Sequence, residues 1–132
     1  MKRTTYKGYR SFEYLEADAD YRAFELVPEL DRVRSTRVEV SKEQEDRVQR
    51  LLTEHLVISL HDHCFVVPKD FSNFGEYRRQ GRDWTGYAGM AQSGLDAVFD
   101  CLMDGTATIT SKAGWKWDDI IYDLGMRLSD IA

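Results

Sequence analysis

Residues 56–64 read Leu-Val-Ile-Ser-Leu-His-Asp-His-Cys, a short apolar run that ends in a pair of histidines. The first five residues of this stretch are apolar apart from Ser59, and β-branched side chains are frequent among them. Such a run is typical of a strand that is buried on both faces of a parallel sheet. The sequence therefore predicts a buried strand over residues 56–60, with His61 and His63 at its carboxyl end.

An amphipathic helix is expected immediately before this strand. Ser41 can accept a hydrogen bond from the backbone three residues later, and Gln44 can return one, as a capping box requires. Four side chains then recur on one face at helical spacing: Val48, Leu51, Leu52 and His55. The pattern predicts a helix that begins after Ser41 and runs to about His55.

Three further segments follow the histidines. Residues 71–94 are polar and contain glycines, so we expect a long loop, which in a compact domain is usually functional or disordered. Residues 97–103 form a second apolar run, which predicts a second strand ending at Asp104-Gly105. Apolar residues then recur at helical intervals and predict a helix that runs to the last residue: Trp117, Ile120, Ile121, Leu124, Leu128 and Ile131.

The order of these elements predicts a fold class. Helix, buried strand, long loop, buried strand and helix form the opening of an α/β architecture with parallel strands. In such folds active sites gather at the carboxyl ends of the strands, where His61 and His63 stand. Residues 1–40 are rich in charge and tyrosine, and we expect them to form an N-terminal extension that packs against another part of the protein.

Composition narrows the classes of partner. A chain of 132 residues with 42% hydrophobic content is sized for one domain with a real core. Its net charge of −5 gives no strong field for holding phosphate backbones or anionic lipid. The aromatic residues of the extension could stack on bases, but the acidic cluster of Glu16, Asp18 and Asp20 would repel the phosphates. We expect neither nucleic acid nor a membrane as a partner.

The cellular compartment is predicted from two features. No run approaches the roughly 20 apolar residues needed to span a bilayer, and the basic amino-terminal residues lack the apolar segment of a secretory signal. Cys64 and Cys101 are too few for a disulfide framework and are expected to be reduced thiols. The expected location is cytoplasmic.

The spacing of the two histidines predicts a metal site. Side chains two apart on a strand point the same way, so His61 and His63 can converge on one point while Asp62 faces away. Two neutral imidazoles on a rigid strand suit zinc or a related divalent transition metal. A bound metal could lower the pKa of water to about 7 and produce the hydroxide of a hydrolase. The alternative is a polar cap on the strand, hydrogen-bonded to its neighbours and free of metal.

Other polar and aromatic residues have either a binding or a structural interpretation. Arg78, Arg79 and Arg82 could bind a substrate carboxylate, because the guanidinium fork matches that geometry, or they could belong to a solvated loop. Cys64 is turned away from the imidazoles by strand alternation, and we interpret it and Cys101 as structural. His55 is interpreted as a packed or partly exposed histidine and not as a ligand, and Trp115 and Trp117 are expected to bury their rings against the sheet.

The order and spacing over residues 45–132 resemble the opening of the membrane dipeptidase family, the renal-dipeptidase-like metallopeptidases of the amidohydrolase superfamily. The segments that carry the resemblance are Leu-Val-Ile-Ser-Leu-His-Asp-His-Cys (56–64) and Ser-Gly-Leu-Asp-Ala-Val-Phe-Asp-Cys-Leu-Met-Asp-Gly (93–105). The resemblance implies a (β/α)8 TIM barrel, two zinc ions per site and hydrolysis of dipeptides. His61 matches the family's first-strand ligand. His63 stands where the family usually has an aspartate, and a histidine at this position is the form seen across the wider amidohydrolase superfamily.

By this interpretation residues 41–132 are the first βα units of a hydrolase barrel. A complete barrel takes about 250 residues, so the remainder would lie in further sequence or in a partner chain, with a large apolar contact surface between the parts. The other metal ligands and the carboxylate that accepts the proton of the water would come from that remainder. Two alternatives stay open: a non-catalytic scaffold or binding subunit, and a self-contained α+β domain in which the histidine pair is coincidental.

Overall fold

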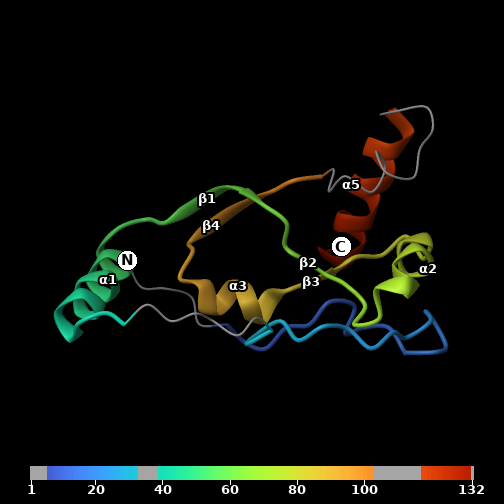
Figure 1. Cartoon of the computed structure of the whole chain (residues 1–132). Helices are drawn as coiled ribbons and strands as arrows, with labels where there is room; N and C mark the ends of the chain where they lie inside the picture. The colour runs from blue at the N-terminus through green and yellow to red at the C-terminus, as the bar shows by residue number, and fades with distance from the viewer. Residues whose placement is uncertain (1–5, 33–38, 103–116, 132) are drawn as a thin grey trace.

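The computed structural model describes residues 6–32, 39–102 and 117–131, and its secondary structure is mixed α/β. The elements in chain order are α1 (Lys42–Glu54), β1 (Ile58–Asp62), β2 (Phe65–Val66), the 3-10 turn η1 (Phe71–Asn73), α2 (Phe74–Arg79), β3 (Trp84–Thr85), α3 (Tyr87–Ser93), β4 (Ala97–Asp100) and α5 (Trp117–Ile131). Figure 1 shows α1 at one end of the molecule and α2 and α5 at the other. Met103, the turn at Asp104-Gly105 and Trp115, to which the sequence assigned roles, lie outside the described residues.

The two expected strands exist and are parallel. β1 pairs with β4 in the register Ile58↔Ala97, with an irregularity before Asp62↔Asp100. β1 begins and ends two residues later than predicted, so that His61 lies inside the strand. Parallel pairing is compatible with the α/β class, and it brings the carboxyl ends of both strands to one edge.

The prediction that the first strand is buried on both faces is wrong for this chain by itself. Leu60 is 78% exposed and Phe99, on β4, is 60% exposed. The physical reason is that β1 and β4 form a sheet of two strands only, and apolar side chains of a parallel sheet are buried when layers cover both faces. Within the described residues this sheet has no such cover.

The prediction of a long loop over residues 71–94 is also wrong. This segment contains η1, α2, β3 and α3, elements of two to seven residues that are too short to produce a clear periodicity. β3 pairs antiparallel with β2, and the phenol of Tyr77 on α2 holds the pair together. Its hydroxyl donates to the Val66 carbonyl at 2.7 Å and accepts from the Trp84 amide at 2.9 Å.

Both predicted helices are confirmed. α1 begins with the capping box expected from the sequence: the Ser41 hydroxyl accepts from the Gln44 amide, and the Gln44 side chain accepts from the Ser41 amide. α5 spans the predicted apolar repeat to Ile131. After α3, Gly94 adopts a φ of +78°, a left-handed conformation that lets the chain turn into β4.

The core lies away from the β1–β4 sheet. Its fully buried apolar side chains come from the N-terminal segment, β2, α2 and α5: Phe12, Val66, Tyr77 and Met126. Asp130 on α5 is 2% exposed and accepts hydrogen bonds from the Ser11 hydroxyl (2.7 Å) and the Phe12 amide (3.0 Å). The N-terminal segment is therefore anchored on the last helix, in line with the packing role expected for it.

Candidate metal centre

The carboxyl ends of β1 and β4 bring three potential metal ligands to one edge. The last ladder pair, Asp62↔Asp100, aligns the strand ends, and the Cys101 amide donates to the Asp62 carbonyl at 2.9 Å. Cys101 is thus held beside Asp62, whose neighbours in the sequence are His61 and His63. The structure adds this residue to the two histidines predicted from the sequence.

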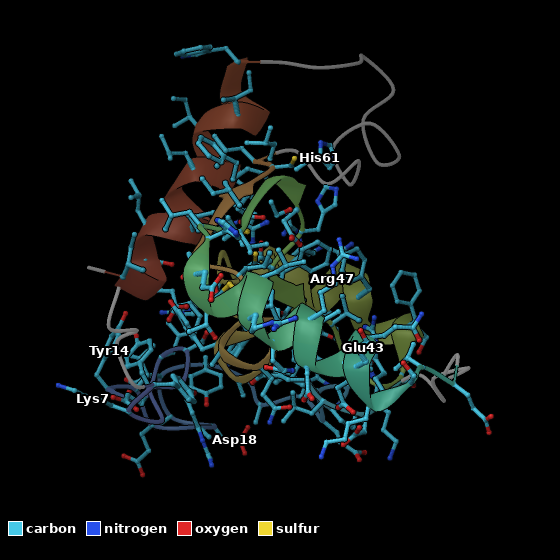
Figure 2. The ribbon with its side chains drawn as sticks, turned by 90° about the vertical axis from the view of Figure 1, so that its left-hand side faces the viewer. Lys7, Tyr14, Asp18, Glu43, Arg47 and His61 are labelled. Atoms are coloured by element: carbon cyan, nitrogen blue, oxygen red, sulfur yellow. The ribbon has the colours of Figure 1, made fainter. Side chains whose placement is uncertain are left out.

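The side chains of His61, His63 and Cys101 converge. The centroids of the two imidazole rings are 5.2 Å apart, with the rings at 82° to each other. The Cys101 Sγ atom lies 3.3 Å from His61 Nδ1, and one ligand atom from each residue can be chosen so that all lie within 4.8 Å of one another. Figure 2 shows His61 on β1, well away from Lys7, Tyr14 and Asp18 of the N-terminal segment.

These separations suit a tetrahedral ion. Zinc bonds of about 2.0–2.1 Å to nitrogen and about 2.3 Å to sulfur place neighbouring ligand atoms about 3.3–3.6 Å apart. The Cys101 sulfur and the His61 nitrogen already meet this spacing, and the third ligand atom lies within 4.8 Å of both. A site with two imidazoles and one thiolate leaves one coordination position open. Catalytic zinc sites have this composition, with three protein ligands and a water or substrate.

Cys101 was interpreted from the sequence as structural, and the structure places it beside His61, where it is a further potential ligand. The signal that could have found it is the parallel pairing itself. If two predicted strands are adjacent and parallel, residues just past their carboxyl ends meet at the same edge. Cys101 directly follows Asp100 at the end of β4, as His63 follows Asp62 at the end of β1.

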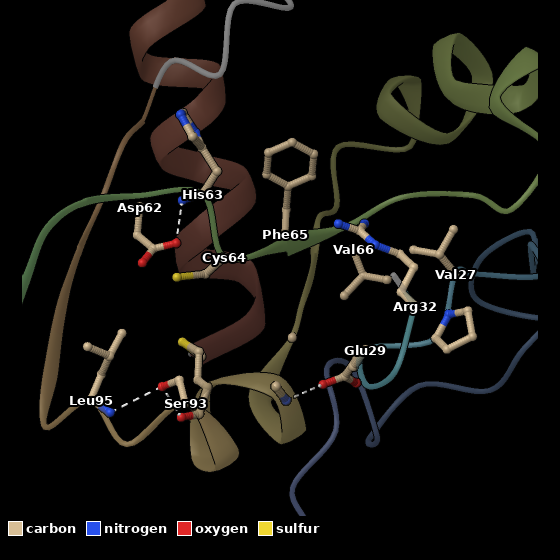
Figure 3. Close-up of a pocket in the computed structure, with 14 residues that line it drawn as sticks. Val27, Glu29, Arg32, Asp62, His63, Cys64, Phe65, Val66, Ser93 and Leu95 are labelled. Carbon is tan, nitrogen blue, oxygen red and sulfur yellow. Dashed lines mark hydrogen bonds between the residues drawn. The ribbon is translucent and has the colours of Figure 1, made fainter. Parts of the chain in front are cut away.

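Asp62 and Cys64 lie on the other side of the strand, as alternation predicts. Figure 3 shows both side chains directed away from the His63 ring. The Asp62 carboxylate accepts from the His63 amide at 2.9 Å. Burial, followed by the negative charges of Asp100 and Asp62, raises the pKa of the Cys64 thiol to about 11. Cys64 is therefore mainly a protonated thiol at neutral pH, and its side chain is directed away from the His63 ring.

A cavity of about 240 Å³ lies beside this edge. It is bounded by the N-terminal segment, β2 and α3, and its wall includes Asp62, His63 and Cys64 together with Glu29 and Arg32 (Figure 3). Glu29 is held in place because its carboxylate accepts from the amides of Ala88 (2.7 Å) and Gly89 (3.2 Å). The cavity lies on the face of the strand that bears Asp62 and Cys64, and its lining includes neither His61 nor Cys101.

The three arginines considered for substrate binding do not gather at this edge. Arg78 is buried and its guanidinium is bonded to the carboxylates of Asp83 and Asp123, so it is not available to a substrate. Arg79 is exposed, and Arg82 lies over the Phe12 ring. None of them lines the cavity next to His63.

Comparisons with models of known protein families, with curated proteins and with solved structures gave no match. The resemblance to the membrane dipeptidase family therefore rests on the motifs quoted above. Within the ranges that the structure describes, no helix is both long enough and apolar enough to cross a membrane.

Proposed function

We propose that His61, His63 and Cys101 together bind a divalent transition metal, zinc being the best fit, and that this centre belongs to a metal-dependent hydrolase. The observation that carries the proposal is that three ligand atoms from the ends of two parallel strands lie within 4.8 Å of one another. A soft thiolate beside two imidazoles favours zinc over magnesium or calcium, which prefer oxygen ligands.

The chemistry follows from the open coordination position. Zinc in such a site lowers the pKa of a bound water to about 7, and the resulting hydroxide can attack an amide carbonyl at neutral pH. His61, His63 and Cys101 would hold and orient the ion.

We further propose that the β1–β4 sheet is the beginning of a (β/α)8 barrel whose other strands come from further sequence or from a partner chain. The exposed apolar side chains on this sheet support this: Leu56, Ile58, Leu60 and Phe99 are 47–78% exposed. A soluble surface rarely presents such a patch unless something covers it. The remaining strands would supply the acceptor for the proton of the water and the ligands of a second zinc ion. The free thiols fit a cytoplasmic location.

The same exposed patch favours a second candidate, a scaffold or binding subunit without chemistry. That subunit would use the apolar sheet to bind its partner and would need no metal. Metal content separates the two candidates.

The test is equilibrium dialysis of the purified 132-residue chain against Zn²⁺, with elemental analysis of the retained metal. We expect about one ion per chain, since one set of ligands binds one ion. His61→Ala and His63→Ala should each abolish stoichiometric binding and leave the urea unfolding midpoint nearly unchanged, because both side chains are exposed.

His55→Ala is the matched control, since His55 is an exposed histidine outside the cluster and its removal should not change the zinc content. Absence of zinc from the unmodified chain, or unchanged zinc in the His61→Ala variant, would refute the metal centre and favour the scaffold.

A further inference from the structure

An ion-pair network connects α5 to the edge that bears the metal ligands. Arg127 on α5 is largely buried, and its guanidinium contacts two carboxylates: Nη1 lies 2.6 Å from Asp83 Oδ2 and Nε lies 2.9 Å from Asp100 Oδ2. The same guanidinium lies 5.6 Å from the centre of the Phe65 ring. Arg127 therefore joins the buried centre of the molecule to the last residue of β4.

Asp100 holds both strand ends at once. It is the residue before Cys101 on β4, and its Oδ1 atom accepts from the Cys64 amide at 3.2 Å, one residue after His63. Its carboxylate is thus shared: Oδ1 accepts a hydrogen bond from the chain that leaves β1, and Oδ2 forms an ion pair with Arg127 Nε at 2.9 Å, without hydrogen-bond geometry. Rotation of this carboxylate would break its hydrogen bond to the Cys64 amide, one residue after His63.

The rest of the network stabilises the helices and does not reach the ligands. Asp83 is 1% exposed and is shared by Arg127 and Arg78, and Arg78 continues to Asp123 on α5 at 2.7 Å. If Arg127 is removed, Asp83 keeps Arg78 as a partner, whereas Asp100 loses the cation on its Oδ2 atom. The Asp100 side chain is 26% exposed, so without that cation its carboxylate can turn toward water and release the Cys64 amide.

We propose that Arg127 is a positioning residue of the metal centre: it fixes the Asp100 carboxylate, which holds the ends of β1 and β4 in the geometry that lets three ligand atoms converge. This inference rests on the proposed metal centre. Supporting groups around metal ligands typically change metal affinity by 10- to 100-fold, because they set the orientation of the ligands.

The experiment is a titration of the full chain with Co²⁺, followed by its d–d bands and its thiolate-to-metal charge-transfer band, and a competition with Zn²⁺. Arg127→Met keeps much of the side-chain bulk and removes the charge. We expect at least about tenfold weaker binding and a weaker charge-transfer band, because Cys101 no longer meets the histidines.

Asp123→Asn is the matched control. This substitution also removes a charge from α5, but the affected carboxylate pairs with Arg78, whereas Arg127 pairs with Asp100. It should lower the unfolding midpoint without changing the cobalt spectrum or the affinity. If Arg127→Met does not fold, Asp100→Asn tests the same contact from its other end, with the same expected loss of affinity.

The outcomes separate this inference from the function on which it rests. Absence of cobalt binding by the unmodified chain overturns both. Normal binding by the unmodified chain together with unchanged affinity and spectrum in Arg127→Met, or an equal loss in Asp123→Asn, overturns the positioning role alone.

Discussion

At the residue scale, the two cysteines have opposite chemistry although both follow the ends of parallel strands. The Cys101 sulfur contacts the exposed His61 ring at 3.3 Å, next to the other imidazole. The Cys64 sulfur lies across the strand, where burial and two carboxylates raise its pKa to about 11. The Cys101 thiol is a potential metal ligand, and burial raises the pKa of the Cys64 thiol.

This difference predicts the reaction of each thiol with iodoacetamide, which attacks thiolates. A pKa of about 11 leaves about one Cys64 side chain in a thousand ionised at pH 8. Cys64 should therefore be alkylated slowly at pH 8, and its rate should rise about tenfold for each pH unit up to about pH 11. Added Zn²⁺ should slow the alkylation of Cys101 and leave that of Cys64 unchanged.

Peptide mass spectrometry measures both rates in one sample, and the His63→Ala variant is the control in which Zn²⁺ should no longer protect Cys101. Equal protection of both thiols, or fast alkylation of Cys64 at pH 8, would contradict these assignments.

At the element scale, α1 is stabilised mainly by local interactions. It has no buried residue, and Val48 and Leu51 on its apolar face are 51% and 46% exposed. Helices of this length are marginal in water without tertiary packing, so their end caps matter. The capping box at Ser41 satisfies backbone amides that the helix leaves without partners.

Ser41→Ala should therefore destabilise α1 by about 1 kcal/mol, because a hydroxyl cap is lost. Hydrogen exchange of the amides of α1, followed by mass spectrometry, should speed up in this variant. The amides of α5 should not change. Thr53→Ala is the control, because its hydroxyl donates to the Gln49 carbonyl inside the same helix and caps no free amide. Faster exchange in the control than in Ser41→Ala would show that the cap is unimportant.

Elements with a strong local signal could be predicted, and short ones could not. α1 and α5 carry repeated apolar residues over 13 and 15 residues, and β1 and β4 carry dense apolar runs. α2, β3 and α3 depend instead on contacts with distant segments, such as the Tyr77 hydroxyl between Val66 and Trp84. The polar, glycine-containing sequence of residues 71–94 gives no indication of these contacts, so this segment was predicted as a loop.

At the scale of the whole molecule, the buried centre and the candidate site are separate regions connected by an ion pair. The centre is built from the N-terminal segment, α2, β2, β3 and α5, while the site stands at the edge of an exposed two-stranded sheet. Arg127 and Asp100 link the two regions. A stable centre can thus hold the ligands in place while the apolar sheet stays open for the strands that we propose to complete it.

The candidate site could be predicted only in part, because contacts between distant segments cannot be seen in the sequence. His61 and His63 belong to one strand, so alternation was enough to place them together. Cys101 is 40 residues from His61, and only the pairing of β1 with β4 brings it there. Arg78 was grouped with Arg79 and Arg82 as a possible substrate-binding residue, because the segment that contains them was predicted as a loop. Only the folded structure shows that Arg78 is paired with the buried carboxylates of Asp83 and Asp123.

X-ray absorption spectroscopy at the zinc edge of the zinc-loaded chain tests the central claim most directly, because it counts the ligand types around the ion. The three converging side chains predict about two nitrogen ligands at about 2.0–2.1 Å, one sulfur ligand at about 2.3 Å and one further light atom from water. A spectrum with no sulfur ligand, or one with oxygen and nitrogen atoms alone, would contradict a shared centre of His61, His63 and Cys101.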